Sequence, residues 1–558
     1  MGKIKYWLIV GFIILFAIFY IAISDRDSTL SRLKSAGENG DVEAQYALGL
    51  MYLYGEILDV DYQQAKIWYE KAADQNDPRA QAKLGVMYAN GLGVNQDYQQ
   101  SKLWYEKAAA QNDVDAQFLL GEMYDDGLGV SQDYQHAKMW YEKAAAQNDE
   151  RAQVNLAVLY AKGNGVEQDY RQAKSWYEKA AAQNSPDAQF ALGILYANAN
   201  GVEQDYQQAK DWYEKAAEQN FANAQFNLGM LYYKGEGVKQ NFRQAREWFE
   251  KAASQNQPNA QYNLGQIYYY GQGVTQSYRQ AKDWFEKAAE KGHVDAQYNL
   301  GVIYENGEGV SQNYQQAKAW YEKAAAQNDE RAQVNLAVLY AKGNGVEQDY
   351  RQAKSWYEKA AAQNSPDAQF ALGILYANAN GVEQDYQQAK DWYEKAAEQN
   401  FANAQFNLGM LYYKGEGVKQ NFRQAREWFE KAASQNQPNA QYNLGQIYYY
   451  GQGVTQSYRQ AKDWFEKAAE KGHVDAQYNL GVIYENGEGV SQNYQQAKAW
   501  YEKAASQNDA QAQFELGVMN ELGQGESIDL KQARHYYERS CNNGLKKGCE
   551  RLKELLYK

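Results

Sequence analysis

The chain has 558 residues, of which 57 are basic and 70 acidic, giving a formal net charge of −13. Nucleic-acid binding depends on lysine and arginine neutralising phosphates, and no stripe of these residues stands out, so nucleic acid is not an expected partner. Five prolines, 50 tyrosines and 45% hydrophobic residues predict a helical chain with an aromatic core. The four histidines are widely scattered, which predicts no metal site, and we expect no cofactor.

The N-terminal segment Tyr6–Ile23 is an unbroken run of 18 apolar or aromatic residues. This length is just sufficient for a helix to cross the roughly 30 Å hydrocarbon core of a bilayer, so residues 6–23 are predicted to form a transmembrane anchor. Lys3 and Lys5 precede the run, and acidic residues follow it. The positive-inside rule therefore places residues 1–5 in the cytoplasm of a bacterium and the rest of the chain in the periplasm.

A cleaved signal peptide is the alternative reading of the same segment. Ala22-Ile23-Ser24 loosely fits a small-x-small cleavage site, so the chain would be exported after cleavage near Ser24. The apolar run is longer than the 7–15 residues of a typical signal sequence, which favours the uncleaved anchor at the inner membrane. Both alternatives take the chain out of the cytosol.

From Ala44 onward the sequence repeats every 36 residues without insertion or deletion. Internal repetition of this period is typical of solenoids, in which each unit contacts only its neighbours. Fourteen full units cover residues 44–547. We expect residues 24–43 to be a linker and an N-terminal half-repeat cap, and residues 548–558 to be a C-terminal capping helix.

Each unit is predicted to contain two antiparallel helices. In one unit, Asp77 and Pro78 have the residue types of an N-cap and of a first helical position, and Gly91 has that of a helix end. Asp97 is the expected N-cap of the second helix. Most units have asparagine at the end of that helix, as at Asn112, and three have glycine (Gly292, Gly472 and Gly544), which indicates a backbone position of positive φ.

Thirteen of the fourteen tryptophans recur at one position of the unit, from Trp68 to Trp500. An aromatic ladder for ligands is one interpretation of this column. We predict instead that it is a structural core column, because bulky rings next to small alanines pack well between hairpins.

The repeated pattern AQxxLGxxYxxGxGVxQDYxQAKxWYEKAAxQN resembles the Sel1-like repeat, a relative of the tetratricopeptide repeat. In one unit the matching residues are Ala116-Gln117, Leu120-Gly121, Tyr124, Gly127-Leu-Gly-Val130, Asp133-Tyr134, Ala137-Lys138, Trp140-Tyr141 and Lys143-Ala144-Ala145. The resemblance implies an all-α, right-handed α/α superhelical solenoid. It also implies adaptor roles between proteins, often in the bacterial envelope, in secretion or in host contact, but it names no ligand.

The two cysteines of the chain lie at its C-terminal end, Cys541 in the last full unit and Cys549 in the predicted capping helix. This last unit resembles the repeats of the helicobacter cysteine-rich proteins, in which a disulfide links the second helix of one repeat to the following helix. The resemblance implies a disulfide between Cys541 and Cys549, and two free thiols are the alternative.

Residues 140–325 and 320–505 are identical, shifted by 180 residues or five repeats. A unit that contacts only its neighbours can be copied without disturbing the others. The copy would lengthen a multivalent binder and duplicate its sites, although an assembly artefact of the sequence is an alternative explanation.

Asparagine recurs at the fourth position of the first helix, where it is a poor helix former. One hypothesis is an amide ladder that binds the backbone of an extended partner peptide, with nearby variable residues reading its side chains. The alternative is that the asparagines bond a neighbouring helix or loop. The asparagines are Asn155, Asn227, Asn263, Asn299, Asn335, Asn407, Asn443 and Asn479, and the variable residues are Met230, Lys234, Gln266 and Tyr270.

Catalytic motifs are nearly absent from the sequence. Ser31-Arg-Leu-Lys34 fits S-x-x-K but has no K-T-G or S-D-N companion, so we predict that the protein is not an enzyme. The leading interpretation is a membrane-anchored scaffold of the bacterial envelope that binds partner proteins or peptides. Because some Sel1-like relatives carry a penicillin-binding or β-lactamase label, a cell-wall- or β-lactam-directed protein that contacts peptidoglycan is an alternative. A secreted host-interaction factor is another.

Overall fold

The computed structural model describes residues 26–55 and 58–557, and these residues form thirty α-helices and no strand. The predicted all-α class is therefore confirmed. The predicted cytoplasmic end and anchor at residues 1–23 lie outside the described residues. No helix within the described ranges is long and apolar enough to cross a membrane.

The first helices of the fourteen repeats begin just before the alanine that opens each unit. They are α3 (Val42–Tyr54), α5 (Pro78–Asn90), α7 (Val114–Asp126), α9 (Glu150–Lys162), α11 (Pro186–Ala197), α13 (Ala222–Lys234), α15 (Pro258–Tyr270), α17 (Val294–Asn306), α19 (Glu330–Lys342), α21 (Pro366–Ala377), α23 (Ala402–Lys414), α25 (Pro438–Tyr450), α27 (Val474–Asn486) and α29 (Ala510–Leu522).

The second helices alternate with the first, and one further helix stands at each end. The second helices are α4 (Tyr62–Asp74), α6 (Tyr98–Ala110), α8 (Tyr134–Ala146), α10 (Tyr170–Ala182), α12 (Tyr206–Glu218), α14 (Phe242–Ser254), α16 (Tyr278–Glu290), α18 (Tyr314–Ala326), α20 (Tyr350–Ala362), α22 (Tyr386–Glu398), α24 (Phe422–Ser434), α26 (Tyr458–Glu470), α28 (Tyr494–Ser506) and α30 (Leu530–Asn542). The end helices are α2 (Arg26–Glu38) and α31 (Lys546–Tyr557).

The predicted helix ends are confirmed in the repeat that begins at Ala80, which contains most of α5 and all of α6. The Asp77 side chain accepts a hydrogen bond from the Ala80 N–H at the start of α5, and the Asp97 side chain caps α6 in the same way. Gly91 has a φ of 68°, and Asn112 has a φ of 64°. Both residues are thus in the left-handed region that the sequence pattern indicated.

Close packing inside most repeats depends on a glycine in the first helix. A Cβ at Gly301 of α17 would overlap the ring of Tyr321, which is fully buried on α18. Most repeats place glycine and a tyrosine or phenylalanine at these two positions. The missing Cβ therefore allows the two helices to approach closely enough to bury the ring.

A set of hydrogen-bonded amides ties the ends of the helices together. Gln369, at the second position of its repeat, is only 3% exposed. Its Oε1 accepts a hydrogen bond from Nε2 of Gln399 at 2.8 Å, and its own Nε2 donates to Oδ1 of Asn364 in the preceding repeat at 3.2 Å. These bonds satisfy buried polar groups and link consecutive repeats.

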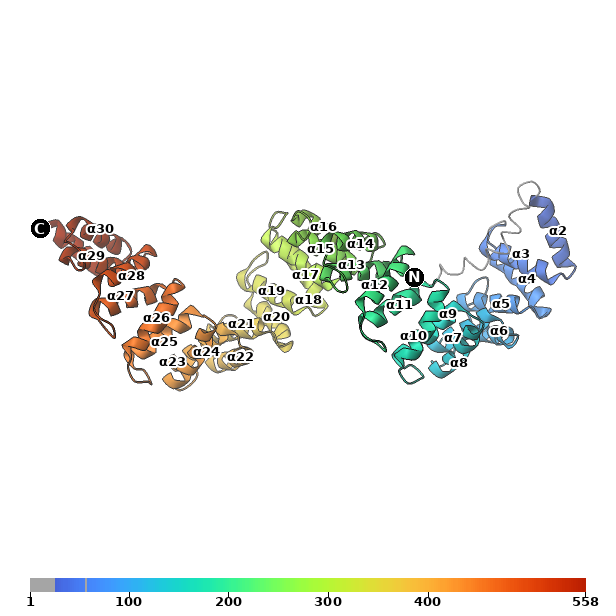
Figure 1. The fold of residues 1–558 in the computed structure, drawn as a ribbon, viewed down its shortest axis with the longest axis horizontal. Coiled ribbons are helices and arrows are strands. Elements are labelled where there is room, and N and C mark those ends of the chain that lie inside the picture. The colour runs from blue at the N-terminus through green and yellow to red at the C-terminus, as the bar shows by residue number, and fades with distance from the viewer. Residues whose placement is uncertain (1–25, 56–57, 558) are drawn as a thin grey trace. The chain divides into compact units, whose positions relative to one another are not determined.

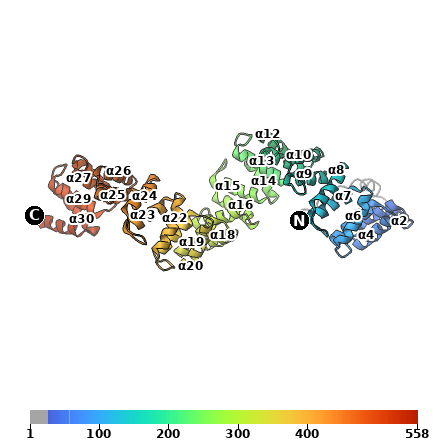
Figure 2. The ribbon, with the colours of Figure 1, turned by 90° about the horizontal axis from the view of Figure 1, so that it is seen from below.

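The described helices fall into two compact units, α2–α15 and α16–α31, divided between residues 276 and 277. Within each unit consecutive helices pack against each other, first helix on second helix and second helix on the next first helix. Repeats that follow one another in the chain therefore lie side by side within a unit, as Figures 1 and 2 show. Each unit is an α-helical solenoid.

The tryptophan column differs in part from the prediction. Trp68 is buried at 6% exposure, but the other twelve members are half-buried. In each of the thirteen repeats with this tryptophan, a lysine three residues later lies over the ring; Lys395 Nζ, for example, is 3.9 Å from the ring centroid of Trp392. The predicted core column is therefore confirmed in part: half-buried rings such as Trp140 and Trp176 pack against the core with one side and contact a lysine cation with the other.

Candidate partner-binding surface

We number the positions of a repeat from the alanine that opens each unit. The first helices bury positions 1, 2 and 5, which are 0–5% exposed in the repeats that begin at Ala296 and Ala332. Positions 4, 7 and 11 are half-buried or exposed in these repeats. We call the surface formed by positions 4, 7, 10 and 11 of the first helices the first-helix surface. It contains all the asparagines and variable residues singled out in the sequence.

Several of the asparagines contact a tyrosine of the preceding repeat. Asn335 Nδ2 donates a hydrogen bond to the Tyr321 hydroxyl at 3.0 Å. Burial raises the pKa of Tyr213 to about 12, and a hydrogen bond with Asn227 opposes that shift. Asn155 and Asn407 lie in the same way against the buried tyrosines before them.

The other asparagines have different surroundings. Asn263 Nδ2 and Asn443 Nδ2 each donate to a main-chain carbonyl four residues earlier in their own helix, at 2.8 Å. In these repeats the preceding ring is phenylalanine, which has no hydroxyl group. Asn479 bonds the Tyr442 hydroxyl of the preceding repeat, where burial raises the pKa of Tyr442 to about 12. Asn299 is half-buried at the same position.

The variable residues extend this surface towards solvent. Tyr270 is 62% exposed, and its ring meets Tyr269 edge-on at 5.0 Å between centroids. Lys234 is exposed with its Nζ 3.6 Å from Glu236, Gln266 donates to the Tyr262 hydroxyl at 2.8 Å, and Met230 is half-buried.

Sequence reasoning missed a recurring acid–tyrosine pair between positions 10 and 26 of one repeat. The Tyr321 hydroxyl donates to Glu305 Oε2 at 2.6 Å, and the Tyr501 hydroxyl donates to Glu485 Oε2 at 2.7 Å. Where position 26 is phenylalanine, as at Phe249, position 10 is tyrosine instead. The tyrosine at position 10 wherever position 26 is phenylalanine is the one sequence signal that links the two positions, and it does not by itself predict the bond to an acid.

Two carboxyl groups approach each other beside the last of the duplicated repeats. Glu515 of α29 occupies position 4, where the repeat five units earlier has Asn335. Burial and the nearby Glu485 carboxylate raise the pKa of Glu515 to about 7, and the Lys547 ammonium acts in the opposite direction. Glu515 is therefore partly protonated at neutral pH, unlike an ordinary surface glutamate.

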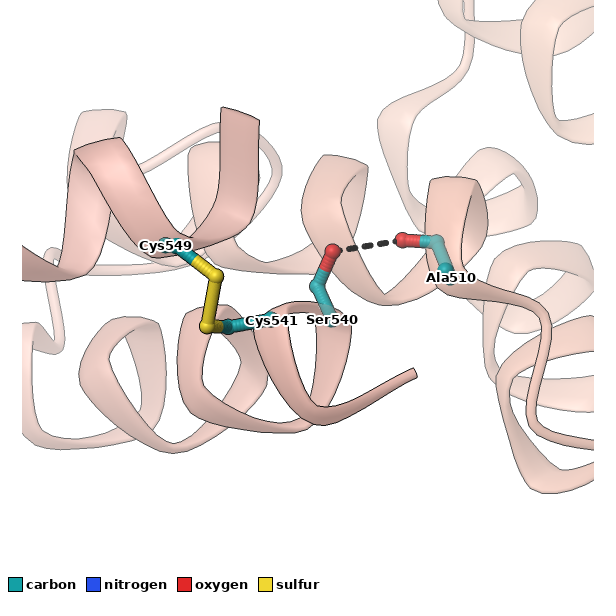
Figure 3. Close-up of a disulfide and its surroundings, with 4 residues drawn as sticks. All are labelled: Ala510, Ser540, Cys541 and Cys549. Carbon is teal, nitrogen blue, oxygen red and sulfur yellow. Dashed lines mark hydrogen bonds between the residues drawn. A yellow bond between two sulfur atoms is a disulfide. The ribbon is translucent and has the colours of Figure 1, made fainter. Parts of the chain in front are cut away.

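Cys541 and Cys549 are joined by a disulfide, with their Cα atoms 4.5 Å apart (Figure 3). The bond connects α30 to α31. The neighbouring Ser540 Oγ donates to the Ala510 carbonyl of α29 at 2.7 Å, so three successive helices are linked at this end. No group of three histidine, cysteine or acidic side chains suited to a metal ion occurs in the described ranges.

A profile described as the Sel1 repeat matches fourteen consecutive segments of the chain, from 42–77 to 510–545. The chain belongs to the Sel1 repeat family. The matched segments start two residues before the alanines used to number the repeats, at the first residue of each first helix. The predicted resemblance and the predicted number of repeats are confirmed.

Two solved structures are similar to this Sel1 repeat protein. One is a protective antigen present in uropathogenic Escherichia coli strains that displays an SLR fold. It is 36% identical over 80% of this chain and 97% of that chain, with a TM-score of 0.61. The other, a Sel1 repeat protein from Oxalobacter formigenes, is 30% identical over 62% of this chain and 89% of that chain, with a TM-score of 0.44. A comparison with curated proteins finds no match.

Proposed function

We propose that this Sel1 repeat protein is a scaffold that binds partner proteins or peptides on its first-helix surface. The observation that carries the proposal is that buried positions of the repeat are nearly constant whereas an exposed position of the first helix varies. Positions that stack the helices are nearly constant from repeat to repeat, whereas position 11 of the first helix changes freely. It is Asn90, Asp126, Lys162, Lys234 and Tyr270 in five of the repeats. A surface that varies on a constant framework is suited to recognition.

The asparagines supply the chemistry for binding an extended peptide. An amide group has two N–H donors and one carbonyl acceptor, and Asn335 hydrogen-bonds the hydroxyls of both Tyr321 and Tyr298. The two tyrosines orient the amide, and its carbonyl oxygen remains to accept a hydrogen bond from the N–H of a peptide backbone. The exposed Lys234 and Tyr270 would then contact the side chains of the partner.

The location of the scaffold belongs to the same proposal. We infer that residues 6–23 anchor the protein in the inner membrane of a bacterium and that the repeats lie in the periplasm. The apolar run supports the anchor, and the Cys541–Cys549 disulfide supports an oxidising compartment.

The proposal is tested by crosslinking in cells, followed by purification of the full chain and mass spectrometry of the attached proteins. We expect a reproducible envelope partner that is lost when Asn227, Asn263 and Asn299 are changed to alanine. The matched control changes three exposed glutamines of the second helices, Gln172, Gln208 and Gln280, to alanine and should keep the partner. Glycan fragments in place of a protein partner would refute the scaffold.

Two other functions remain as alternatives. A cell-wall- or β-lactam-directed protein would bind a labelled penicillin covalently or retain peptidoglycan, and the scaffold proposal predicts neither result. The relative described as a protective antigen favours a host-interaction factor instead. Cleavage after Ser24, detected as a new N-terminus in the culture medium, would support that reading.

A further inference from the structure

The compact unit α16–α31 contains the acid–tyrosine pair three times: Glu305 with Tyr321, Glu485 with Tyr501, and Glu521 with Tyr537. At the third pair, another side chain of the protein also binds the glutamate. At the third pair the Tyr537 hydroxyl donates to Glu521 Oε2 at 2.8 Å. Arg551 of α31 approaches the same carboxylate with two donors: Nε is 2.9 Å from Oε2 and Nη2 is 2.9 Å from Oε1. This is the two-pronged geometry in which a guanidinium binds a carboxylate most strongly.

Arg551 reaches Glu521 from a defined place in the repeat. The place is position 4 of the helix that follows the pair, where the other two pairs have Asn335 and Glu515. Both of those side chains are shorter than arginine, and Asn335 extends only as far as the tyrosine hydroxyl. At the first two pairs, position 4 of the following helix therefore carries no cationic side chain that could bind the glutamate as Arg551 does.

The first two pairs have no cation of their own. In the part of the chain that the structure describes, the Glu305 and Glu485 carboxylates accept hydrogen bonds from the Tyr321 and Tyr501 hydroxyls, and neither forms an ion pair with lysine, arginine or histidine. Both glutamates are half-buried, so a ligand can reach them from the first-helix surface. The tyrosine hydroxyls hold one carboxylate oxygen in place, as Tyr537 does for Glu521.

We propose that Glu305 with Tyr321, and Glu485 with Tyr501, bind arginine side chains of a partner protein. This inference rests on the proposed scaffold function and names the chemistry of its partner. A planar guanidinium matches two carboxylate oxygens, which the point charge of lysine does not. The two pairs are copies of one sequence five repeats apart, so a partner with two arginines can engage both and gain avidity.

The test uses the full-length protein and a labelled probe peptide, acetyl-(Gly-Arg)₄-amide, in a fluorescence polarisation titration at physiological salt. The control probe has citrulline, a neutral arginine isostere, in place of each arginine. We expect the arginine probe to bind at least about tenfold more tightly than the citrulline probe, because hydrogen bonds to charged groups are the strong ones. Equal affinity for both probes overturns the proposal.

The site is located with paired variants. Glu305→Gln with Glu485→Gln should weaken the arginine probe by about tenfold or more and leave the citrulline probe unchanged. The matched control, Glu322→Gln with Glu502→Gln, removes the same charge from the second helices of the same two repeats and should change the affinity less than twofold. An equal loss in both double variants would mean that only net charge attracts the probe, and the proposal would fail.

A third variant tests the tyrosines as positioning residues. Tyr321→Phe with Tyr501→Phe keeps the ring, and the chain itself has phenylalanine at this position in Phe249 and Phe429, so the fold is retained. We expect a several-fold loss for the arginine probe and none for the citrulline probe; no loss would overturn the role of the hydroxyl. The peptide assay needs no cellular partner, so its failure leaves the crosslinking result untouched, and the reverse also holds.

Discussion

We predict that Glu515 makes the C-terminal repeat sensitive to pH, and the repeat five units earlier provides a natural substitution with which to test this. The perturbation is Glu515→Asn, because Asn335 occupies the same position five repeats earlier in a similar environment. The groups facing Glu515 are Glu485 and Tyr478 of α27, Tyr501 of α28 and Lys547 of α31. Of these, the Glu485 carboxylate adds to the cost of a charge on Glu515.

The magnitude follows from the pKa shift. The pKa of Glu515 rises from an ordinary value of 4.5 to about 7 in the folded protein. At about 1.36 kcal/mol per unit, ionised Glu515 destabilises the folded repeat by at most about 3 kcal/mol, since water reaches the half-buried carboxyl. Below pH 4.5 the group is protonated in both states and costs nothing. The penalty grows as the pH rises from 4.5 to 7 and is constant above that.

Hydrogen exchange of residues 510–557, followed by mass spectrometry, measures the local stability of this end. Repeats contact only their neighbours, so the effect should stay near the C-terminus. At pH 8 we expect Glu515→Asn to slow exchange by up to the order of 100-fold relative to the unchanged protein, and at pH 4.5 we expect little difference. The reciprocal Asn335→Glu should speed local exchange at pH 8. A stabilisation by Glu515→Asn that is equal at both pH values would refute the electrostatic reasoning.

Three further predictions concern stability. Gln441 Oε1 is a buried atom without a hydrogen-bond partner, because Lys471 stands where most repeats have a glutamine that donates to it. Lys471→Gln should therefore raise the free energy of unfolding by about 1 kcal/mol in urea. Ala379 has a φ of 58° where most repeats have glycine, so Ala379→Gly should raise stability by about 1 kcal/mol in the same assay. Reduction of the Cys541–Cys549 disulfide should cost the end of the solenoid about 2–3 kcal/mol, measured by hydrogen exchange of α31.

Each of these predictions has a clear contrary result. No gain from Lys471→Gln would mean that water or the lysine itself satisfies the amide. Destabilisation by Ala379→Gly would show that the lost chain entropy of glycine outweighs the relief of strain. Alkylation of both cysteines without prior reduction would show that the disulfide does not form in the isolated protein.

Much of the fold can be predicted from the sequence because each repeat is locally determined. Asp77 and Pro78 begin a helix, Gly91 ends it, and the 36-residue period brings every unit against a neighbour of similar sequence. Local capping and stacking of adjacent units require no long-range information. The class, the helix pairs, the number of repeats and the positive φ at Asn112 follow directly.

Only the tertiary structure shows which side chains contact each other when their positions lie far apart in the repeat. The exposure of each tryptophan depends on how much of the second helix the neighbouring repeats cover, and the 36-residue period of the sequence does not reveal this. The bond between Glu305 and Tyr321 joins residues on different helices, and only their packing sets the distance. Arg551 at Glu521 likewise shows a charge pairing that depends on three successive helices, because electrostatic contacts follow spatial proximity rather than sequence spacing.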